Sequence, residues 1–270
     1  MKSYLRRILS KIDPSLSDNT QYMEETPNLV LQVPPPEGGR RFAIGDIHGC
    51  ALTLKHLLEE ELRITQNDQV FPLGDYIDRG PRNGEAIDYL MDLMGKGFQV
   101  YPIMGNHEEM FLDGYQEYCL NNRPERMRRI YQYYNAEDLF GQEDGWPKPR
   151  YVSFMQHLHY CIDVGDGYLV HANLKPGINM LRDAKAMVWA RQTSLRPDDL
   201  DGKWVIHGHT PEDIGAIRKL VDQRHFNIPL DNGCVFADGH TKKTQLDLGR
   251  LCALDLDSFE LHEARNVDFD

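Results

Sequence analysis

Five short apolar stretches, each followed at once by a polar loop rich in aspartate, asparagine or histidine, constrain the fold more than any other feature. The stretches lie at 41–44, 69–73, 99–103, 168–170 and 204–206. Short apolar runs bounded by turn residues are typical of β-strands. Amphipathic helical patterns follow the first three, at 51–62, 84–94 and 108–120. This alternation predicts an α/β layered fold whose functional groups lie on loops beyond the strand ends.

The regions outside this pattern suggest how the chain is divided. Residues 1–40 are rich in proline and read as an N-terminal extension, in which Lys2 to Ile12 has the pattern of a short basic helix. That helix would pack on the parent domain, with a partner or membrane surface as the alternative. Residues 41–270 are expected to form one domain. Within it, 121–150 reads as a helical insertion that leads into a loop, and 227–262 as β-rich.

Composition excludes several classes of protein. The net charge of -12 argues against nucleic-acid binding, which needs a basic surface. No apolar run approaches the roughly 20 residues that cross a bilayer, so we expect no stable membrane association and a cytoplasmic location. The five cysteines are scattered and form no C-x-x-C pair, which predicts reduced, mostly buried thiols.

The polar loops carry residues that bind metal ions. In chain order they read Gly45-Asp46-Ile47-His48-Gly49, Gly74-Asp75-Tyr76-Ile77-Asp78-Arg79-Gly80-Pro81, Gly105-Asn106-His107-Glu108, Val170-His171-Ala172-Asn173 and His207-Gly208-His209-Thr210. Any one of these segments is weak evidence for a metal site. Five of them in order, each directly after an apolar strand, are hard to attribute to chance. Carboxylate, imidazole and amide oxygen together favour Mn²⁺, Fe or Zn²⁺ over an all-oxygen Mg²⁺ site.

These five motifs resemble the ordered signature of the phosphoprotein phosphatase branch of the calcineurin-like metallophosphoesterases, in particular its bacterial serine/threonine and tyrosine protein phosphatases. The resemblance covers 41–254, nearly the whole chain outside the extension. It implies an α/β fold in which a β-sandwich is flanked by helices and the metal site lies on strand-end loops. It is highly specific for the superfamily and less so for protein substrates.

The resemblance also implies a ligand set for two divalent ions, with Mn²⁺ favoured and Fe or Zn²⁺ as alternatives. Asp46 and His48 would hold the first ion and Asp75 would bridge both. The second ion would be completed by three further ligands: Asn106, His171 and His209. A hydroxide bridging the ions would attack phosphorus in line, since metal ligation can lower the pKa of a water to about 7.

Four further residues receive roles from the resemblance. His107 would be the general acid that protonates the leaving oxygen, oriented by Asp78, because a carboxylate beside an imidazole favours its protonated form. Arg79 and Arg191 would bind phosphate oxygens, which a guanidinium matches in bidentate geometry. His207 is assigned to the core or to a supporting position, because Gly208-His209-Thr210 fits the family motif better.

Three functions are compatible with these residues. The expected substrate is a phosphorylated protein or a small phosphoester. A protein phosphatase is favoured, because symmetric dinucleoside tetraphosphate hydrolases usually have alanine in place of Asp78. Such a hydrolase is the alternative, and a non-catalytic phosphate-binding module is the least favoured. Asn173 and Asn232 depart from the family pattern, which leaves the metal centre intact but the substrate pocket open.

Overall fold

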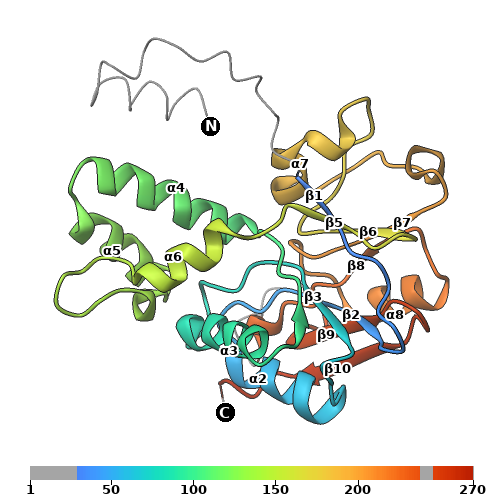
Figure 1. Cartoon of the computed structure of the whole chain (residues 1–270), viewed down its shortest axis with the longest axis horizontal. Helices are drawn as coiled ribbons and strands as arrows, with labels where there is room; N and C mark the ends of the chain where they lie inside the picture. Colours follow the sequence, from blue (N-terminus) through green and yellow to red (C-terminus); the bar gives the residue numbers. More distant parts are fainter. Residues whose placement is uncertain (1–28, 238–245, 270) are drawn as a thin grey trace.

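The computed structural model describes residues 29–237 and 246–269, apart from the side chains of residues 119 and 120. The helix expected at Lys2 to Ile12 therefore lies outside the described residues. Two five-stranded sheets form the centre of the molecule, and helices lie against them (Figure 1). The predicted α/β sandwich flanked by helices is confirmed.

The first sheet holds the strands that lead into the first three motifs. Its order is β10-β9-β2-β3-β4, with bounds Leu261–Arg265, Arg250–Asp255, Arg41–Ile44, Gln69–Pro72 and Gln99–Val100. Strands β2, β3 and β4 are parallel, so their carboxyl ends meet at one edge. Strand β4 is shorter than predicted: Pro102, which has no N–H group, interrupts it, and Ile103 makes only an isolated bridge to His159.

The second sheet carries the last two motifs. Its order is β1-β5-β6-β7-β8, with bounds Val30–Gln32, Cys161–Asp163, Gly167–Val170, Trp204–His207 and Asn227–Pro229. Strand β6 is parallel to β7, as β7 is to β8. The sequence analysis did not predict β1 or β5. Strand β1 lies within the stretch assigned to the extension, yet it pairs in parallel with β5.

Alternate residues of the central strands divide the core in two. Ala43, Phe71 and Cys252 of the first sheet belong to the same buried cluster as Leu169 and Ile206 of the second. Their neighbours along the strands, such as Phe42 and Val70, belong to a second cluster beneath the helices. Side chains alternate between the two faces of a strand, so one set of strands builds both layers.

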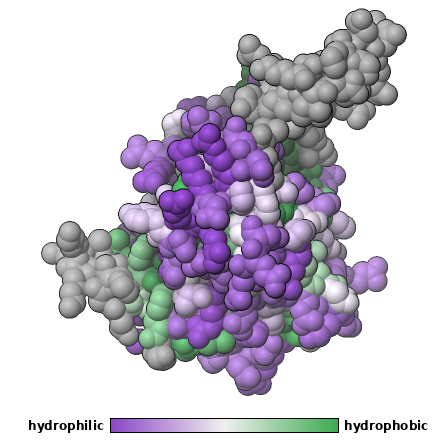
Figure 2. All heavy atoms as spheres, turned by 90° about the vertical axis from the view of Figure 1, so that its left-hand side faces the viewer, coloured by the Kyte–Doolittle hydropathy of each residue, from purple (hydrophilic) through white to green (hydrophobic). Residues whose placement is uncertain are grey.

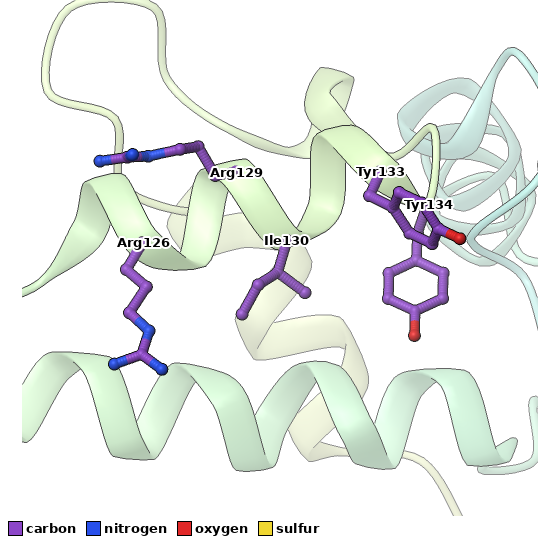
Figure 3. Close-up of a pocket in the computed structure, with 5 residues that line it drawn as sticks. All are labelled: Arg126, Arg129, Ile130, Tyr133 and Tyr134. Carbon is purple, nitrogen blue, oxygen red and sulfur yellow. The ribbon is translucent and has the colours of Figure 1, made fainter.

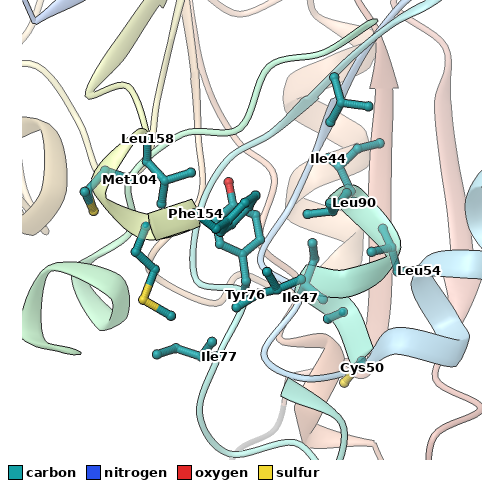
Figure 4. Packing of buried hydrophobic residues seen from close by; sticks show 14 of the residues in the cluster. Ile44, Ile47, Cys50, Leu54, Tyr76, Ile77, Leu90, Met104, Phe154 and Leu158 are labelled. Atoms are coloured by element: carbon teal, nitrogen blue, oxygen red, sulfur yellow. The ribbon is translucent and has the colours of Figure 1, made fainter. Parts of the chain in front are cut away.

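Helices follow the first three motifs: α2 (Ala51–His56), continued by a π-helical turn at Leu57–Glu61, α3 (Asn83–Gly95) and α4 (Asn106–Leu120). Helices α2 and α3 lie against the first sheet, whereas α4 leads away from it (Figure 1). All three predicted helices are confirmed. Tyr76 lies at the centre of this layer against Phe154, with ring centroids 5.6 Å apart (Figure 4). Its hydroxyl lies 2.7 Å from the carbonyl oxygen of Ile103 and 3.1 Å from that of Pro72, so its one hydrogen links the loop after β3 to the residues that follow β4.

A helical insertion extends from one side of the sandwich (Figure 1). It contains α4, α5 (Pro124–Tyr133), a 3₁₀ turn at Glu137–Leu139, a loop, and α6 (Pro149–Gln156). Phe111 of α4 packs on Tyr131 of α5, with ring centroids 4.8 Å apart. The helices α7 (Ala184–Trp189) and α8 (Ile214–Asp222) belong to the second half of the chain.

The last described residues close the first sheet beside the first motif. Strand β9 runs antiparallel to β2, and Arg41 pairs with Asp257, 216 residues away, at 2.5 Å. Asp268 accepts hydrogen bonds from the backbone N–H groups of Leu52 and Thr53, which are unpaired donors at the start of α2. In the described part of the chain, no helix has the length and apolar character needed to cross a membrane.

Candidate metal centre

The five strand-end loops converge on one buried cluster of polar side chains. Its candidate ligands come from the loops after β2, β3, β6 and β7 and from the start of α4. All six residues assigned to the metals lie in this cluster: Asp46, His48, Asp75, Asn106, His171 and His209. All but His209 are almost fully buried. So many buried polar groups need a partner that compensates for lost water.

Asp75 lies between two sets of ligands. Its Oδ2 atom is 3.4 Å from Nε2 of His48, and its Oδ1 atom is 3.3 Å from Nε2 of His171. Two groups can hold an ion on geometric grounds, and each contains Asp75: one with His48 and His107, the other with His171 and His209. One carboxylate thus presents a different oxygen to each half of the cluster.

The tautomers of two histidines direct lone pairs into the cluster. The Nδ1–H of His48 donates to the carbonyl oxygen of Ile77 at 2.8 Å, and that of His171 donates to Leu73 at 2.9 Å. Burial lowers the pKa of His48 to about 3 and also lowers that of His171, so both rings are neutral. Their Nε2 atoms then carry lone pairs that face the oxygens of Asp75. Two acceptors facing each other fit a cation between them, and such Nδ1 contacts are typical of metal-ligating histidines.

The second half of the cluster shows the same deficit of donors. Asn106 Oδ1 lies 3.0 Å from Nε2 of His171 and 2.9 Å from Nδ1 of His209. The Nε2 atom of His209 is buried and has no hydrogen-bond partner among the described residues. Burial also lowers the pKa of His209 to about 4. An ion would satisfy these lone pairs, so the residues present fit a second metal.

Carboxylates crowd around Asp46. Burial raises its pKa, and the nearby Asp231 and Asp75 raise it further. Burial likewise raises the pKa of Asp231 to about 7. Asp46 accepts from the backbone N–H of His209, and a Cβ atom at Gly208 would lie 2.0 Å from its Oδ1, so only glycine fits there. This concentration of acidic groups favours bound positive charge.

Several site residues have backbone conformations that non-glycine residues rarely adopt. Five of them have φ between 46° and 74°: His48, Asp75, Asp78, Arg79 and His209. Residues in this left-handed region cost energy and persist only where surrounding contacts impose them, often at functional sites.

Glu108 supplies much of that constraint and was missed as a functional residue. It is fully buried in the first turn of α4, and its carboxylate accepts from the backbone N–H groups of Asp75, Tyr76, Ile77 and Gly105 at 2.8–3.2 Å. Gly105 leaves room for this contact, because a Cβ atom there would lie 2.2 Å from the Asp75 nitrogen. The glutamate of the Gly105-to-Glu108 motif was its only signal in the sequence. Asp231 had no signal beyond its place in a closing turn.

The structure brings His107 and Asp78 together. The Nδ1–H of His107 donates to Oδ2 of Asp78, and its Nε2 lies 3.9 Å from Oδ2 of Asp75. Burial raises the pKa of Asp78, and the hydrogen bond from His107 opposes that rise. The free nitrogen of His107 is thus directed toward the cluster. This arrangement suits proton donation to a group bound there.

The two arginines assigned to phosphate binding differ in position. The guanidinium of Arg79 donates to Nε2 of His48, so in this structure the lone pair that an ion would bind already accepts a hydrogen bond from a positive group. Arg191 is exposed after α7, and its charge adds to the effect of burial in lowering the pKa of His209. Trp189, the last residue of α7, donates from Nε1 to Glu109 Oε2 at 2.5 Å and so connects α7 to α4. His207 is partly buried beside Gly208, without a place among the ligands.

Known proteins similar to this chain include symmetrical bis(5'-nucleosyl)-tetraphosphatases. That of Pseudomonas putida strain W619 is 26% identical over 190 residues, which are 66% of this chain and 59% of the relative. That of Thioalkalivibrio sulfidiphilus is 37% identical over 67 residues, 25% of this chain and 24% of the relative. The chain therefore spans between about a quarter and three fifths of the length of the curated relatives it matches.

Solved structures show the same fold at low identity. A protein provisionally assigned as a diadenosine tetraphosphatase matches with a TM-score of 0.60 and 17% identity, over 88% of this chain and 97% of that one. A protein serine/threonine phosphatase from Saccharomyces cerevisiae matches with a TM-score of 0.55 and 13% identity, over 99% and 90%.

The family assignment rests on the region that contains every motif. Residues 40–241 match the model of the calcineurin-like phosphoesterases, and this range includes all six candidate ligands together with His107. The chain belongs to the calcineurin-like phosphoesterase family.

Proposed function

We propose that the chain hydrolyses its substrate with water at two divalent metal ions. Asp46 and His48 would hold one ion, Asn106, His171 and His209 would hold the other, and Asp75 would contribute to both. The observation that carries this proposal is the carboxylate of Asp75, whose two oxygens face His48 and His171 separately at 3.4 and 3.3 Å. When bound, two such ions polarise the phosphoryl group and make a water more acidic.

The residues of the chain supply positioning and a proton. Arg79 and Arg191 orient the phosphoryl oxygens, as guanidinium groups do. His107 donates a proton from Nε2 to the leaving oxygen, while Asp78 holds the opposite side of the ring. This step matters most for an alkoxide, which is a poor leaving group unless it is protonated.

The substrate class that we propose is a dinucleoside tetraphosphate cleaved symmetrically. The relatives that match the chain over 190 residues carry this activity in their names. The leaving group would be a nucleoside diphosphate, a stable anion that needs little help from an acid. The metal centre and the arginines would then carry most of the catalysis.

One observation favours a second candidate, a protein phosphatase. Asp78 contacts His107 in the structure, whereas symmetric tetraphosphate hydrolases usually have alanine at that position. A carboxylate that stabilises a protonated imidazole is valuable for expelling a serine or threonine alkoxide. This contact keeps phosphoproteins as the alternative substrate.

A substrate panel tests the proposal. The protein is loaded with Mn²⁺ and assayed with diadenosine tetraphosphate, phosphoserine and phosphotyrosine peptides, and p-nitrophenyl phosphate. We expect diadenosine tetraphosphate to have the highest kcat/KM and to yield ADP as its sole product. A higher kcat/KM for phosphopeptides than for diadenosine tetraphosphate would support the second candidate, a protein phosphatase. If a chelator that removes the metal left all of these activities unchanged, the metal-based proposal itself would be overturned.

A further inference from the structure

A hollow of about 600 Å³ lies along one face of α5. It is lined by Arg126, Arg129, Ile130, Tyr133 and Tyr134 (Figure 3). We call these five residues the α5 face. Counted from Arg126, they occupy positions i, i+3, i+4, i+7 and i+8, so they form one stripe of the helix. The volume is within the range of small-molecule sites.

The tyrosine end of the α5 face is joined to the metal centre. The carbonyl oxygen of Tyr134 accepts from the backbone N–H of Arg79 at 2.7 Å. The side-chain amide of Asn135 donates to the carbonyl oxygens of Arg79 and Gly80 at 3.2 and 2.9 Å. The guanidinium of Arg79 in turn contacts the candidate ligand His48. The α5 face therefore begins one arginine side chain away from the site of hydrolysis, and a nucleoside diphosphate is longer than that side chain.

The aromatic part of the α5 face is unusually open to solvent. Tyr133 is 87% exposed, and its ring contacts that of Tyr134 edge-to-face at a centroid distance of 5.5 Å. Figure 2 looks toward the end of the molecule that carries the helical insertion, and the surface there is mainly hydrophilic. An exposed ring on such a surface offers a planar partner on which a base can stack.

The cationic part of the α5 face has donors to spare. Among the described residues, Arg129 forms no ion pair and no hydrogen bond through its side chain, whereas the adjacent Arg128 pairs with Glu137 at 2.6 Å. Arg129 is also one helical turn from Tyr133, so the two side chains can reach the same ligand. A guanidinium next to a stacked base can donate to acceptor atoms on its edge.

We propose that the α5 face binds the nucleoside of the leaving nucleotide, with the base stacked on Tyr133 and its edge contacted by Arg129. This inference rests on the proposed hydrolysis of dinucleoside tetraphosphates and names the part of the chain that selects them. It makes Tyr133 and Arg129 specificity residues, distinct from the residues that hold metals or donate protons.

The test compares Tyr133→Ala and Arg129→Ala with two matched variants, Tyr133→Phe, which keeps the ring, and Arg128→Ala, which removes a charge from another face of α5. Steady-state kinetics are measured on the Mn²⁺-loaded protein with diadenosine tetraphosphate, with a phosphoserine peptide and with p-nitrophenyl phosphate, which has neither a base nor a peptide. We expect Tyr133→Ala to raise the KM for diadenosine tetraphosphate, divided by the KM for p-nitrophenyl phosphate, about 5–100-fold, as loss of one base-stacking contact does. Arg129→Ala should raise it severalfold, and both matched variants should leave it within twofold.

Failure of the proposed role of the α5 face and failure of the proposed hydrolysis give different results. Hydrolysis of diadenosine tetraphosphate with an unchanged KM in Tyr133→Ala would overturn the role of the α5 face and leave the proposed function intact. No hydrolysis by the wild-type protein would overturn both. A rise in KM confined to phosphopeptides would assign the α5 face to peptide binding and overturn the nucleoside assignment.

Discussion

The side chains of the metal centre are buried on loops held in left-handed conformations, whereas those of the α5 face are exposed on one side of a regular helix. The first region fixes its groups through contacts from several strands. The second fixes the spacing of its groups along one helix and leaves their side chains exposed to solvent. Reaction chemistry needs groups held to a fraction of an ångström, while recognition of a substrate tolerates adjustment. We therefore expect substitutions in the metal centre to affect the reaction itself and substitutions in the α5 face to affect substrate recognition.

The largest effect is expected from Asp75→Asn. It weakens the contact to both ions, so turnover should fall by at least about 10⁴-fold, the size seen when a member of a cooperating catalytic set is removed. Mn²⁺ should also cease to raise the melting temperature, because that gain depends on binding to the folded state. Asp201→Asn is the matched control, since Asp201 is exposed and has φ of 52°, close to the 50° of Asp75. Retained Mn²⁺-dependent activity in Asp75→Asn would remove Asp75 from the centre of the site.

His107→Asn should lower kcat for phosphoserine peptides by roughly 10²–10⁴-fold, the usual contribution of general acid catalysis. The loss should be small for p-nitrophenyl phosphate and diadenosine tetraphosphate, whose leaving groups need little protonation. The stabilisation by Mn²⁺ should persist. Equal losses on every substrate would mean that His107 organises the site. Loss of metal binding would make it a ligand, an assignment that its position near His48 and Asp75 permits on geometry.

Glu108→Gln should lower the free energy of unfolding by on the order of 3 kcal/mol, because it places an amide donor against buried N–H donors. Thermal or urea unfolding measures this change. Glu109→Gln, at the adjacent position, is the control: Glu109 is only partly buried and its carboxylate accepts from Trp189. Similar losses in the two variants would show that the strained loops do not depend on Glu108.

The smallest effect is expected from Arg191→Ala. Arg191 is exposed, so its loss should raise KM about tenfold, at the low end for a hydrogen bond to a charged group. Arg196→Ala removes another exposed arginine nearby and should have no effect on KM. An effect of Arg191→Ala on kcat alone would place this arginine among the groups that act in the transition state.

The motifs predicted the neighbourhood of the metal centre well because each follows a short apolar strand. Parallel strands such as β2 and β3 bring their carboxyl ends together, so Asp46 and Asp75 had to meet. The division of the two residues between the two ions follows from the family resemblance. Sequence patterns could not identify Glu108 as a structural acceptor, because its partners are backbone N–H groups of a distant loop.

Other features depended on contacts that no local pattern encodes. Val30 to Gln32 reads as part of a proline-rich extension, and it becomes β1 only because β5 offers a parallel partner. The insertion was predicted as helical, but the open face of α5 was not, because tyrosines and arginines at helical spacing usually pack or pair. Only the structure shows that Arg128 is paired through its side chain, whereas Arg129 has no such partner among residues 29–237 and 246–269.

The contact between Arg41 and Asp257 shows when, during synthesis, the first sheet can be completed. The two residues are 216 positions apart, and β9 flanks the strand that leads into the first metal loop. During synthesis the chain emerges from its N-terminal end, so β2 and β3 are available long before β9 exists. Pairings of such long range are slow to form. Until they form, β2 remains at an open sheet edge and the loop of Asp46 and His48 lacks its final support. The first metal site is therefore finished only after β9 has been synthesised, so the loop of Asp46 and His48 stays incomplete while the chain between β2 and β9 is made.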